Sequence, residues 1–193
     1  YHQLLSNPDN FQAFTFLTHT AKELQIALLQ TVKSKKEFID KCLEVYQVQF
    51  ESSLQKIKPQ SETEIKAITK RKGGVSTIFC HQMINDQMTN PIRNILYQSG
   101  ELGQLCDDIY DMYDDIHLGI HTWPIVVREW SQIESYIYQK SKELNTLVDD
   151  LPYNNKSKNE FKVLSHLLNA MSMYALQKLK TRFTARKPIQ IEE

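Results

Sequence analysis

Apolar residues recur three and four positions apart along most of this chain, and that spacing restricts the fold more than any other feature of the sequence. The pattern is clearest over residues 14–28, 38–54 and 163–176. Residues three or four apart share one face of an α-helix, whereas a half-buried β-strand requires strict alternation of apolar and polar residues. The sequence shows no such alternation over the length of a strand. The sequence therefore predicts an all-α fold.

Glycine and proline are scarce, and most of them stand where one helical pattern stops and the next begins. Only five glycines and six prolines occur in 193 residues. Because these residues end or interrupt helices, they divide the chain into segments. The polar stretch LPYNNKSKN at 151–159 is rich in turn-forming residues and predicts a surface loop. We predict helices at about 10–33, 35–57, 61–88, 91–118, 122–148 and 158–184.

The composition is that of one ordinary globular domain, with 41% hydrophobic and 24% charged residues. Lysine plus arginine equal aspartate plus glutamate, so the net charge gives no reason to expect nucleic acid as a partner. No segment reaches the roughly 18 apolar residues that a membrane span needs. Three widely separated cysteines favour reduced thiols. We expect a single all-α domain over residues 1–193, cytoplasmic and without a membrane span.

Five aspartates lie within nine positions, from 107 to 115, in a segment that otherwise has a helical pattern. Aspartate disfavours helix interiors, and like charges four residues apart repel each other. Apolar neighbours such as Leu105 and Ile109 indicate a packed helix, where burial increases the repulsion unless a cation offsets it. Mg²⁺ binds carboxylates and leaves room for substrate phosphates. The pattern predicts a Mg²⁺ site, with a solvated acidic face as the alternative, along a stripe of Gln104, Asp107, Asp108, Asp111 and Asp115.

Three short motifs occur in order around these aspartates. They are ITKRKGGVS at 68–76, GELGQLCDDIYD at 100–111 and GIHTWPIVV at 119–127. In residue types, spacing and order they resemble motifs of the class I isoprenoid synthases, in particular the trans-prenyl diphosphate synthases. In this resemblance Gly100, Gln104 and the three aspartates at 107, 108 and 111 match the residues of the second aspartate-rich helix of that family. It covers roughly residues 45–130.

The resemblance implies a terpenoid-synthase-like bundle of long helices around a central apolar cavity, and possible association as a homodimer. It implies Mg²⁺ as the cofactor and a prenyl diphosphate as the small-molecule substrate. The implied activity is ionisation of an allylic diphosphate, with prenyl transfer in chain elongation as the expected outcome. The implied catalytic and metal residues are Asp107, Asp108 and Asp111, with Asp115 as a further metal ligand. Lys72 would contact the diphosphate, with Arg71 and Gln104 as additional diphosphate-binding residues.

Two departures from the family pattern leave alternatives open. The first aspartate-rich motif of the family does not occur in these 193 residues, and Ile120 stands where the family has a lysine. We expect the chain to be the C-terminal part of a longer synthase-like protein; the alternative is a catalytically silent helical binding or interaction protein. A second register, Asp111 and Asp115 followed by Gly119, resembles the squalene and phytoene synthase branch. Terpene cyclisation would begin with the same ionisation.

Overall fold

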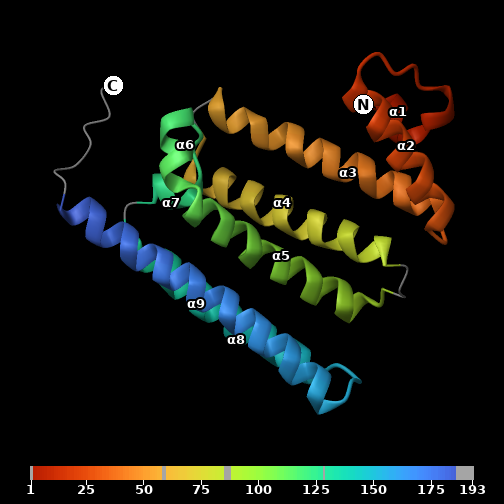
Figure 1. The fold of residues 1–193 in the computed structure, drawn as a ribbon. Coiled ribbons are helices and arrows are strands. Elements are labelled where there is room, and N and C mark those ends of the chain that lie inside the picture. The colour runs from red at the N-terminus through yellow and green to blue at the C-terminus, as the bar shows by residue number, and fades with distance from the viewer. Residues whose placement is uncertain (1, 58–59, 85–87, 128, 186–193) are drawn as a thin grey trace.

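The structure is a computed structural model that describes residues 2–57, 60–84, 88–127 and 129–185. These residues form helices joined by loops and contain no strand, which confirms the all-α prediction (Figure 1). Among the described helices, none combines the length and the apolar content that crossing a membrane requires. The elements are α1 (His2–Ser6), η1 (Pro8–Asn10), α2 (Phe16–Thr31), α3 (Lys35–Ser53), η2 (Leu54–Lys56), α4 (Glu62–Met83), α5 (Asn90–Tyr110), α6 (Met112–Leu118), α7 (Trp123–Val126), α8 (Ser131–Asp149) and α9 (Asn155–Ala185).

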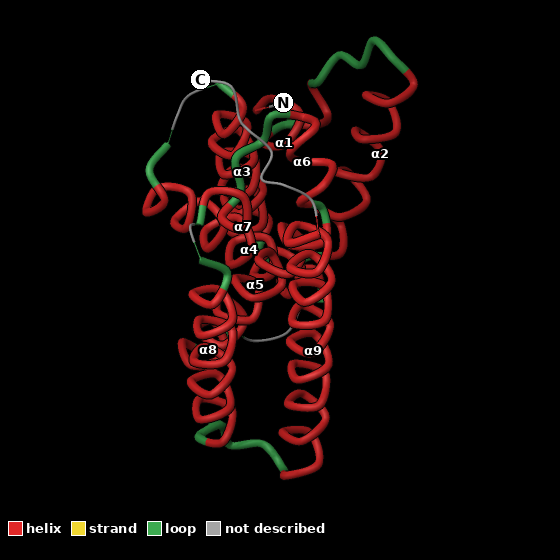
Figure 2. The backbone as a smooth tube through the Cα atoms, turned by 90° about the vertical axis from the view of Figure 1, so that its left-hand side faces the viewer, coloured by secondary structure: helices red, strands yellow, loops and turns green. Residues whose placement is uncertain are grey.

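The long helices are arranged as a layer in which α3, α4, α5 and α9 follow one another across the molecule (Figure 1). Helix α8 runs beside α9, as the view in Figure 2 shows, and packs against both α5 and α9. Helices α1 and α2 form a separate group at the end of α3 that is remote from α6. The short helices α6 and α7 lie at the other end of the layer, where α5 ends.

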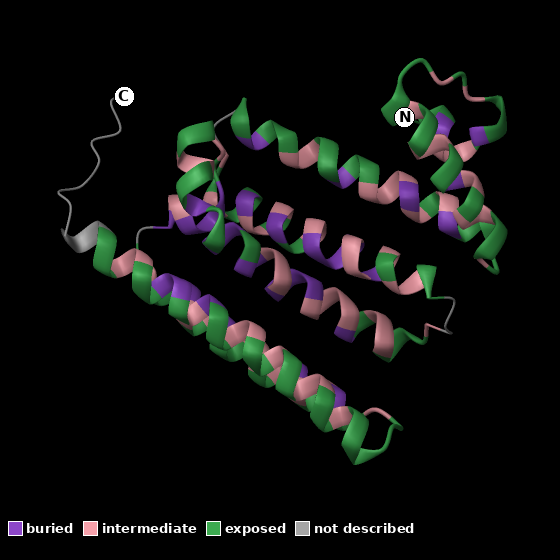
Figure 3. Cartoon of the chain, in the orientation of Figure 1, coloured by how far each residue is buried: buried purple, intermediate pink, exposed green. Residues whose placement is uncertain are grey.

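The apolar core lies between α4, α5, α8 and α9, and the buried positions follow the inner faces of these helices (Figure 3). Trp123 of α7 closes this core at one end and is 3% exposed. Its ring makes an edge-to-face contact with Tyr136, with 5.0 Å between centroids. The core includes Ile65, Ile95, Leu102, Leu105, Ile109, Ile133, Ile137, Leu144 and Leu176.

The predicted helix at 91–118 is two helices, so that prediction is wrong near its C-terminal end. Helix α5 ends at Tyr110 and α6 begins at Met112. Asp111 between them has φ −85° and ψ 0°, the bridge conformation found at turns. Aspartate is a weak helix former, and a cluster of five favours such a break.

The predicted helix at 122–148 is also divided. Proline at the start of α7 suits the first turn of a helix, but α7 ends after four residues at Val126. Val127 is extended, with φ −68° and ψ 134°. Three β-branched residues in succession, 125–127, oppose a continuous helix because each loses side-chain freedom there. Helix α8 then begins at Ser131 and ends at Asp149, close to the predicted end.

Two predicted helix starts are displaced. The helix expected at 10 begins at Phe16, where Thr15 and Thr18 form a capping box, and residues 8–10 form a separate 3-10 turn. The helix expected at 158 begins at Asn155, within the predicted loop 151–159, because the side chain of Asn154 accepts a hydrogen bond from the Ser157 amide. The predicted starts at 35 and 61 lie within one residue of α3 and α4.

Candidate functional site

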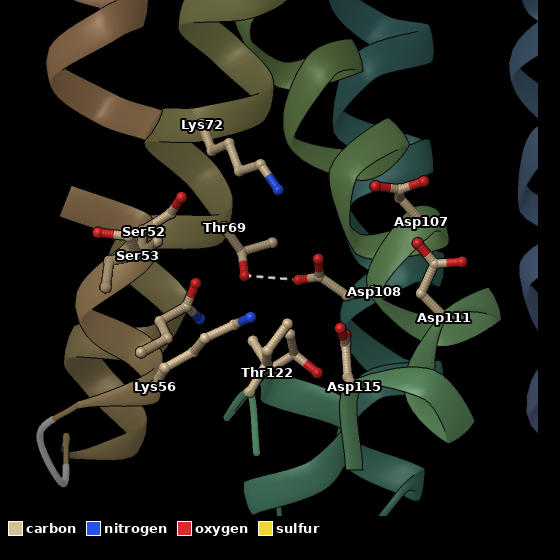
Figure 4. Close-up of a pocket in the computed structure, with 13 residues that line it drawn as sticks. Ser52, Ser53, Lys56, Thr69, Lys72, Asp107, Asp108, Asp111, Asp115 and Thr122 are labelled. Carbon is tan, nitrogen blue, oxygen red and sulfur yellow. Dashed lines mark hydrogen bonds between the residues drawn. The ribbon is translucent and has the colours of Figure 1, made fainter. Parts of the chain in front are cut away.

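A pocket of about 170 Å³ opens where the C-terminal end of α3 meets α4 and the junction of α5 and α6 (Figure 4). One wall is acidic and comes from the α5–α6 junction. The opposite wall comes from α3, η2 and α4 and carries two lysines. The pocket therefore places groups of opposite charge across a small space. Its charged lining residues are Lys56, Lys72, Asp107, Asp108, Asp111 and Asp115.

The acidic wall contains the aspartates at 107, 108, 111 and 115, which the sequence predicted on one helical stripe. Asp107 and Asp108 lie in the last turn of α5, and Asp115 lies in α6. The bend at Asp111 does not separate the two groups, since the Asp115 amide still donates to the Asp111 carbonyl at 2.8 Å. The fifth aspartate, Asp114, is exposed and does not line the pocket.

Asp108 is the buried member of the acidic wall and is 7% exposed. Its two carboxylate oxygens accept hydrogen bonds from the Thr69 hydroxyl and from the Gln104 amide, each at 2.8 Å. Burial raises the pKa of Asp108 above its ordinary value, and these two hydrogen bonds oppose the shift. Asp108 is thus held in a fixed position in which its negative charge is only partly compensated.

Asp115 is half-buried and accommodates a negative charge poorly. Burial, followed by the charges of Asp108 and Asp111, raises the pKa of Asp115 to about 6. The positive charge of Lys72 opposes the shift without cancelling it. A cation bound beside these carboxylates would therefore relieve an existing repulsion.

Lys72 and Lys56 supply positive charge from the opposite wall. Lys72 comes from the middle of α4, and Lys56 comes from η2 at the end of α3. Figure 4 shows both amino groups directed into the space that the aspartates border. Lysine is a compact charge with three donors and suits a phosphate oxygen. The sequence motifs predict Lys72 at this position and give no indication of Lys56.

The other predicted diphosphate contacts lie outside the lining of the pocket. Arg71 forms an ion pair with Glu51 of α3. Gln104 hydrogen-bonds both Asp107 and Asp108, at 3.1 and 2.8 Å, so it orients the acidic wall.

A close crossing of α4 and α5 fixes the distance between the two walls. At this crossing Gly73 and Gly100 face each other, and a Cβ atom on Gly73 would lie 2.0 Å from the Gly100 carbonyl oxygen. A Cβ atom on Gly100 would lie 2.2 Å from the Gly73 carbonyl oxygen. Both positions therefore require glycine. Because Lys72 directly precedes Gly73, this contact holds Lys72 close to α5, the helix that carries Asp107 and Asp108.

The loop after α6 forms the floor of the pocket. Gly119 ends α6 in the left-handed conformation, with φ 66°, which favours glycine. The Gln55 side chain then donates to the His121 carbonyl at 2.9 Å and joins this loop to the end of α3. Ile120 and Thr122 consequently line the pocket, and Ile120 supplies no charge there.

Ser52, Ser53, Gln55 and Lys56 are pocket residues that the sequence analysis did not identify. They belong to the end of α3 and to η2, on either side of Leu54, and polar residues are also typical of an ordinary exposed helix end. What identifies them as pocket residues is their proximity to the motif at 119–127, and this proximity is visible only in the folded chain.

The donor set of the pocket suits Mg²⁺ in its chemistry. Carboxylate oxygens are the ligands that Mg²⁺ prefers, and one or two of them commonly suffice when phosphates and waters complete the shell. Within the described residues, no group of three or more Asp, Glu, His or Cys side chains is arranged around a point that could hold a metal ion. The described residues therefore form no closed metal cage, and a Mg²⁺ ion bound there would need further ligands such as phosphate oxygens or waters.

A comparison of this chain with protein-family models, with curated proteins and with solved structures found no match.

Proposed function

We propose that this chain is a Mg²⁺-dependent isoprenoid synthase-like enzyme that ionises an allylic prenyl diphosphate for prenyl transfer, as in chain elongation. The observation that carries the proposal is the opposition of four aspartates and two lysines across one pocket. In such a pocket Mg²⁺ would bind the aspartates, and the negatively charged diphosphate would bind the lysines. The motif resemblance, which predicts the aspartates and Lys72, supports the same substrate class.

Each wall would have a separate task. Asp107, Asp111 and Asp115 are the carboxylates available to hold Mg²⁺, while Asp108 is kept in place by its hydrogen bonds. When bound, Mg²⁺ supplies positive charge that stabilises a departing diphosphate. Lys72 and Lys56 would bind the diphosphate oxygens and stabilise the charge that develops as the carbon–oxygen bond breaks.

The proposal includes a terpenoid-synthase-like arrangement with an apolar cavity for the prenyl chain. Ile68 and Ile120 are the apolar residues at the edge of the charged groups, so the first carbons of the chain would contact them. A carbocation formed there must be kept from water, which requires further apolar cover over the pocket.

A catalytically silent binding protein is the second candidate function. It is favoured by the hydrogen bonds that commit both oxygens of Asp108 to Thr69 and Gln104. It is also favoured by Ile120, which supplies no cation where the family that the motifs resemble has a lysine. Squalene or phytoene synthase-like condensation and terpene cyclisation remain proposals for the same pocket, because Asp115 lines it together with Asp111.

The proposal is tested by pyrophosphate release from geranyl and farnesyl diphosphates, in Mg²⁺ and in EDTA. We expect release that requires Mg²⁺, falls roughly 100-fold in Asp111→Asn and is unchanged in Asp114→Asn, the exposed neighbour outside the pocket. A requirement for isopentenyl diphosphate would separate chain elongation from condensation of two allylic substrates and from cyclisation. No release by the folded protein would contradict the enzyme proposal, and retained binding of Mg²⁺ and pyrophosphate would then favour the silent binding protein.

A further inference from the structure

Helix α9 is apolar on its outer face as well as on its inner face. The inner face packs against α5 and α8, where Leu176 is fully buried. The outer face is exposed, as the surface positions along α9 in Figure 3 show. Between residues 163 and 174 the exposed positions are apolar except for His166, and such a face on a helix is typical of one that another element covers. The α9 outer face, which we define as Val163, Leu164, Leu167, Met171 and Tyr174, has side chains between 45 and 66% exposed.

The spacing along this face is that of a coiled-coil seam. Positions 160, 164, 167, 171, 174 and 178 are separated by alternating steps of four and three residues. This alternation keeps every side chain on the line of contact with a partner helix. The steps also have the same order when counted from either end. A second copy of the helix can therefore pair with the first in the antiparallel direction, with the same six positions in contact.

We infer that the α9 outer face pairs antiparallel with the same face of a second copy of this chain, about a twofold axis. In this register Leu164 lies opposite Tyr174 of the second copy, and Leu167 lies opposite Met171. Ala170, a small exposed residue, lies near the axis and allows the two helices to approach closely. A twofold interface is self-complementary, so each contact occurs twice.

Charge selects the antiparallel direction. Glu160 and Lys178 stand at the two ends of the seam and are both exposed. Within the chain Glu160 lies 3.9 Å from Lys156, and Lys178 lies over the Tyr174 ring, so each keeps one local contact on the solvent-facing helix. In the antiparallel pair each Glu160 faces Lys178 of the second copy. In a parallel pair the two glutamates would face each other, as would the two lysines, and like charges in contact are unfavourable.

The exposed apolar area of this face limits how strongly two copies can bind. Five side chains of this size and exposure would each bury on the order of 100 Å², so two copies would bury roughly 1,000 Å². That area lies near the lower limit for a specific protein interface. The inference is independent of the proposed function, since it requires neither Mg²⁺ nor substrate.

The first test exchanges the charges at the ends of the seam and measures the dimer dissociation constant by sedimentation equilibrium. Glu160→Lys or Lys178→Glu alone should raise this constant roughly tenfold, and the double exchange should restore most of the loss. Lys142→Glu, an exposed lysine on α8, should leave the constant unchanged. A chain that is monomeric at tens of micromolar, or a dimer that does not respond to either single exchange, would overturn the inference.

The second test places a cysteine at the axis. Ala170→Cys in a Cys80→Ser background should be joined to a second copy by a short bis-maleimide, because Cys42 and Cys106 are buried. Tyr138→Cys in the same background is the control, at a 75% exposed position of α8. Covalent dimer from Ala170→Cys alone supports the inference. Equal yields from both variants, or no covalent dimer from either, would overturn the inference that the α9 outer face is the interface.

Discussion

Replacement of Gly100 by alanine tests the glycine crossing that sets the distance between the two walls of the pocket. The added Cβ atom would lie 2.2 Å from the Gly73 carbonyl oxygen and 2.4 Å from the Thr77 hydroxyl. Ordinary contacts begin at about 3.4 Å, so the helices would have to separate by roughly 1 Å. Because the nearest atom belongs to the backbone, it cannot move by a change of rotamer.

The magnitude follows from two opposing effects. Overpacking lowers the free energy of unfolding by about 1 to 3 kcal/mol, and we take about 3 kcal/mol because the clash is with the backbone. Alanine is a better helix former than glycine, which raises the free energy of unfolding by about 1 kcal/mol. We therefore expect Gly100→Ala to destabilise the protein by about 2 kcal/mol. Gly103→Ala, in the same helix, meets nothing within 4 Å and should stabilise by about 1 kcal/mol.

Urea unfolding followed by circular dichroism measures both variants. With a denaturant slope of about 2 to 3 kcal/mol per molar, the two midpoints should differ by about 1 M, with Gly100→Ala the lower. Equal midpoints, or a stabilised Gly100→Ala, would refute the close crossing and with it the argument that Lys72 is held beside the aspartates.

Further predictions concern the acidic wall. Thr69→Val removes the donor to buried Asp108 and should lower the free energy of unfolding by about 1 to 3 kcal/mol, whereas Thr146→Val on the exposed face of α8 should have little effect in the same urea assay. The pKa of Asp115 is about 6 in the folded chain and near 3.8 when unfolded, so the folded state binds more protons between these values and stability falls as pH rises through that window. Asp115→Asn should therefore raise the urea midpoint at pH 7.5 and have little effect below pH 4. A variant that is less stable than wild type at pH 7.5 would contradict the raised pKa of Asp115. Saturating Mg²⁺ and pyrophosphate should raise the wild-type melting temperature more than that of Lys72→Ala, as a thermal shift assay would show.

The sequence predicts the helical class and the composition of the acidic wall because both follow from local spacing. Asp107, Asp108 and Asp111 lie where a helical stripe places them, and the break at Asp111 leaves them on one side of the pocket. The break itself was not predicted, since the helical spacing of Ile109, Tyr113 and Ile116 continues across it and no glycine or proline marks it. Weak helix formers end a helix only when the surrounding packing also favours the bend.

The opposite wall of the pocket depends on tertiary contacts that sequence spacing does not contain. Lys56 enters the pocket because Gln55 binds the His121 carbonyl, a contact between residues 66 positions apart. Arg71 lies next to Lys72 in the sequence, yet it turns to Glu51 because adjacent helical residues point in different directions. Likewise, Leu17 and Leu24 follow the helical spacing of a core face, but they are 77 and 60% exposed in α2. Periodicity identifies an apolar face without identifying what covers it.

The most direct test of the central claim, that the acidic pocket binds a diphosphate through Mg²⁺, is isothermal titration calorimetry of pyrophosphate into the 193-residue chain. We predict binding in Mg²⁺ that disappears in EDTA, weakens at least about tenfold in Asp111→Asn and in Lys72→Ala, and persists in Asp114→Asn. Binding that is absent in Mg²⁺, or that is equally strong in all three variants, would contradict the claim and leave the aspartates as a solvated acidic face.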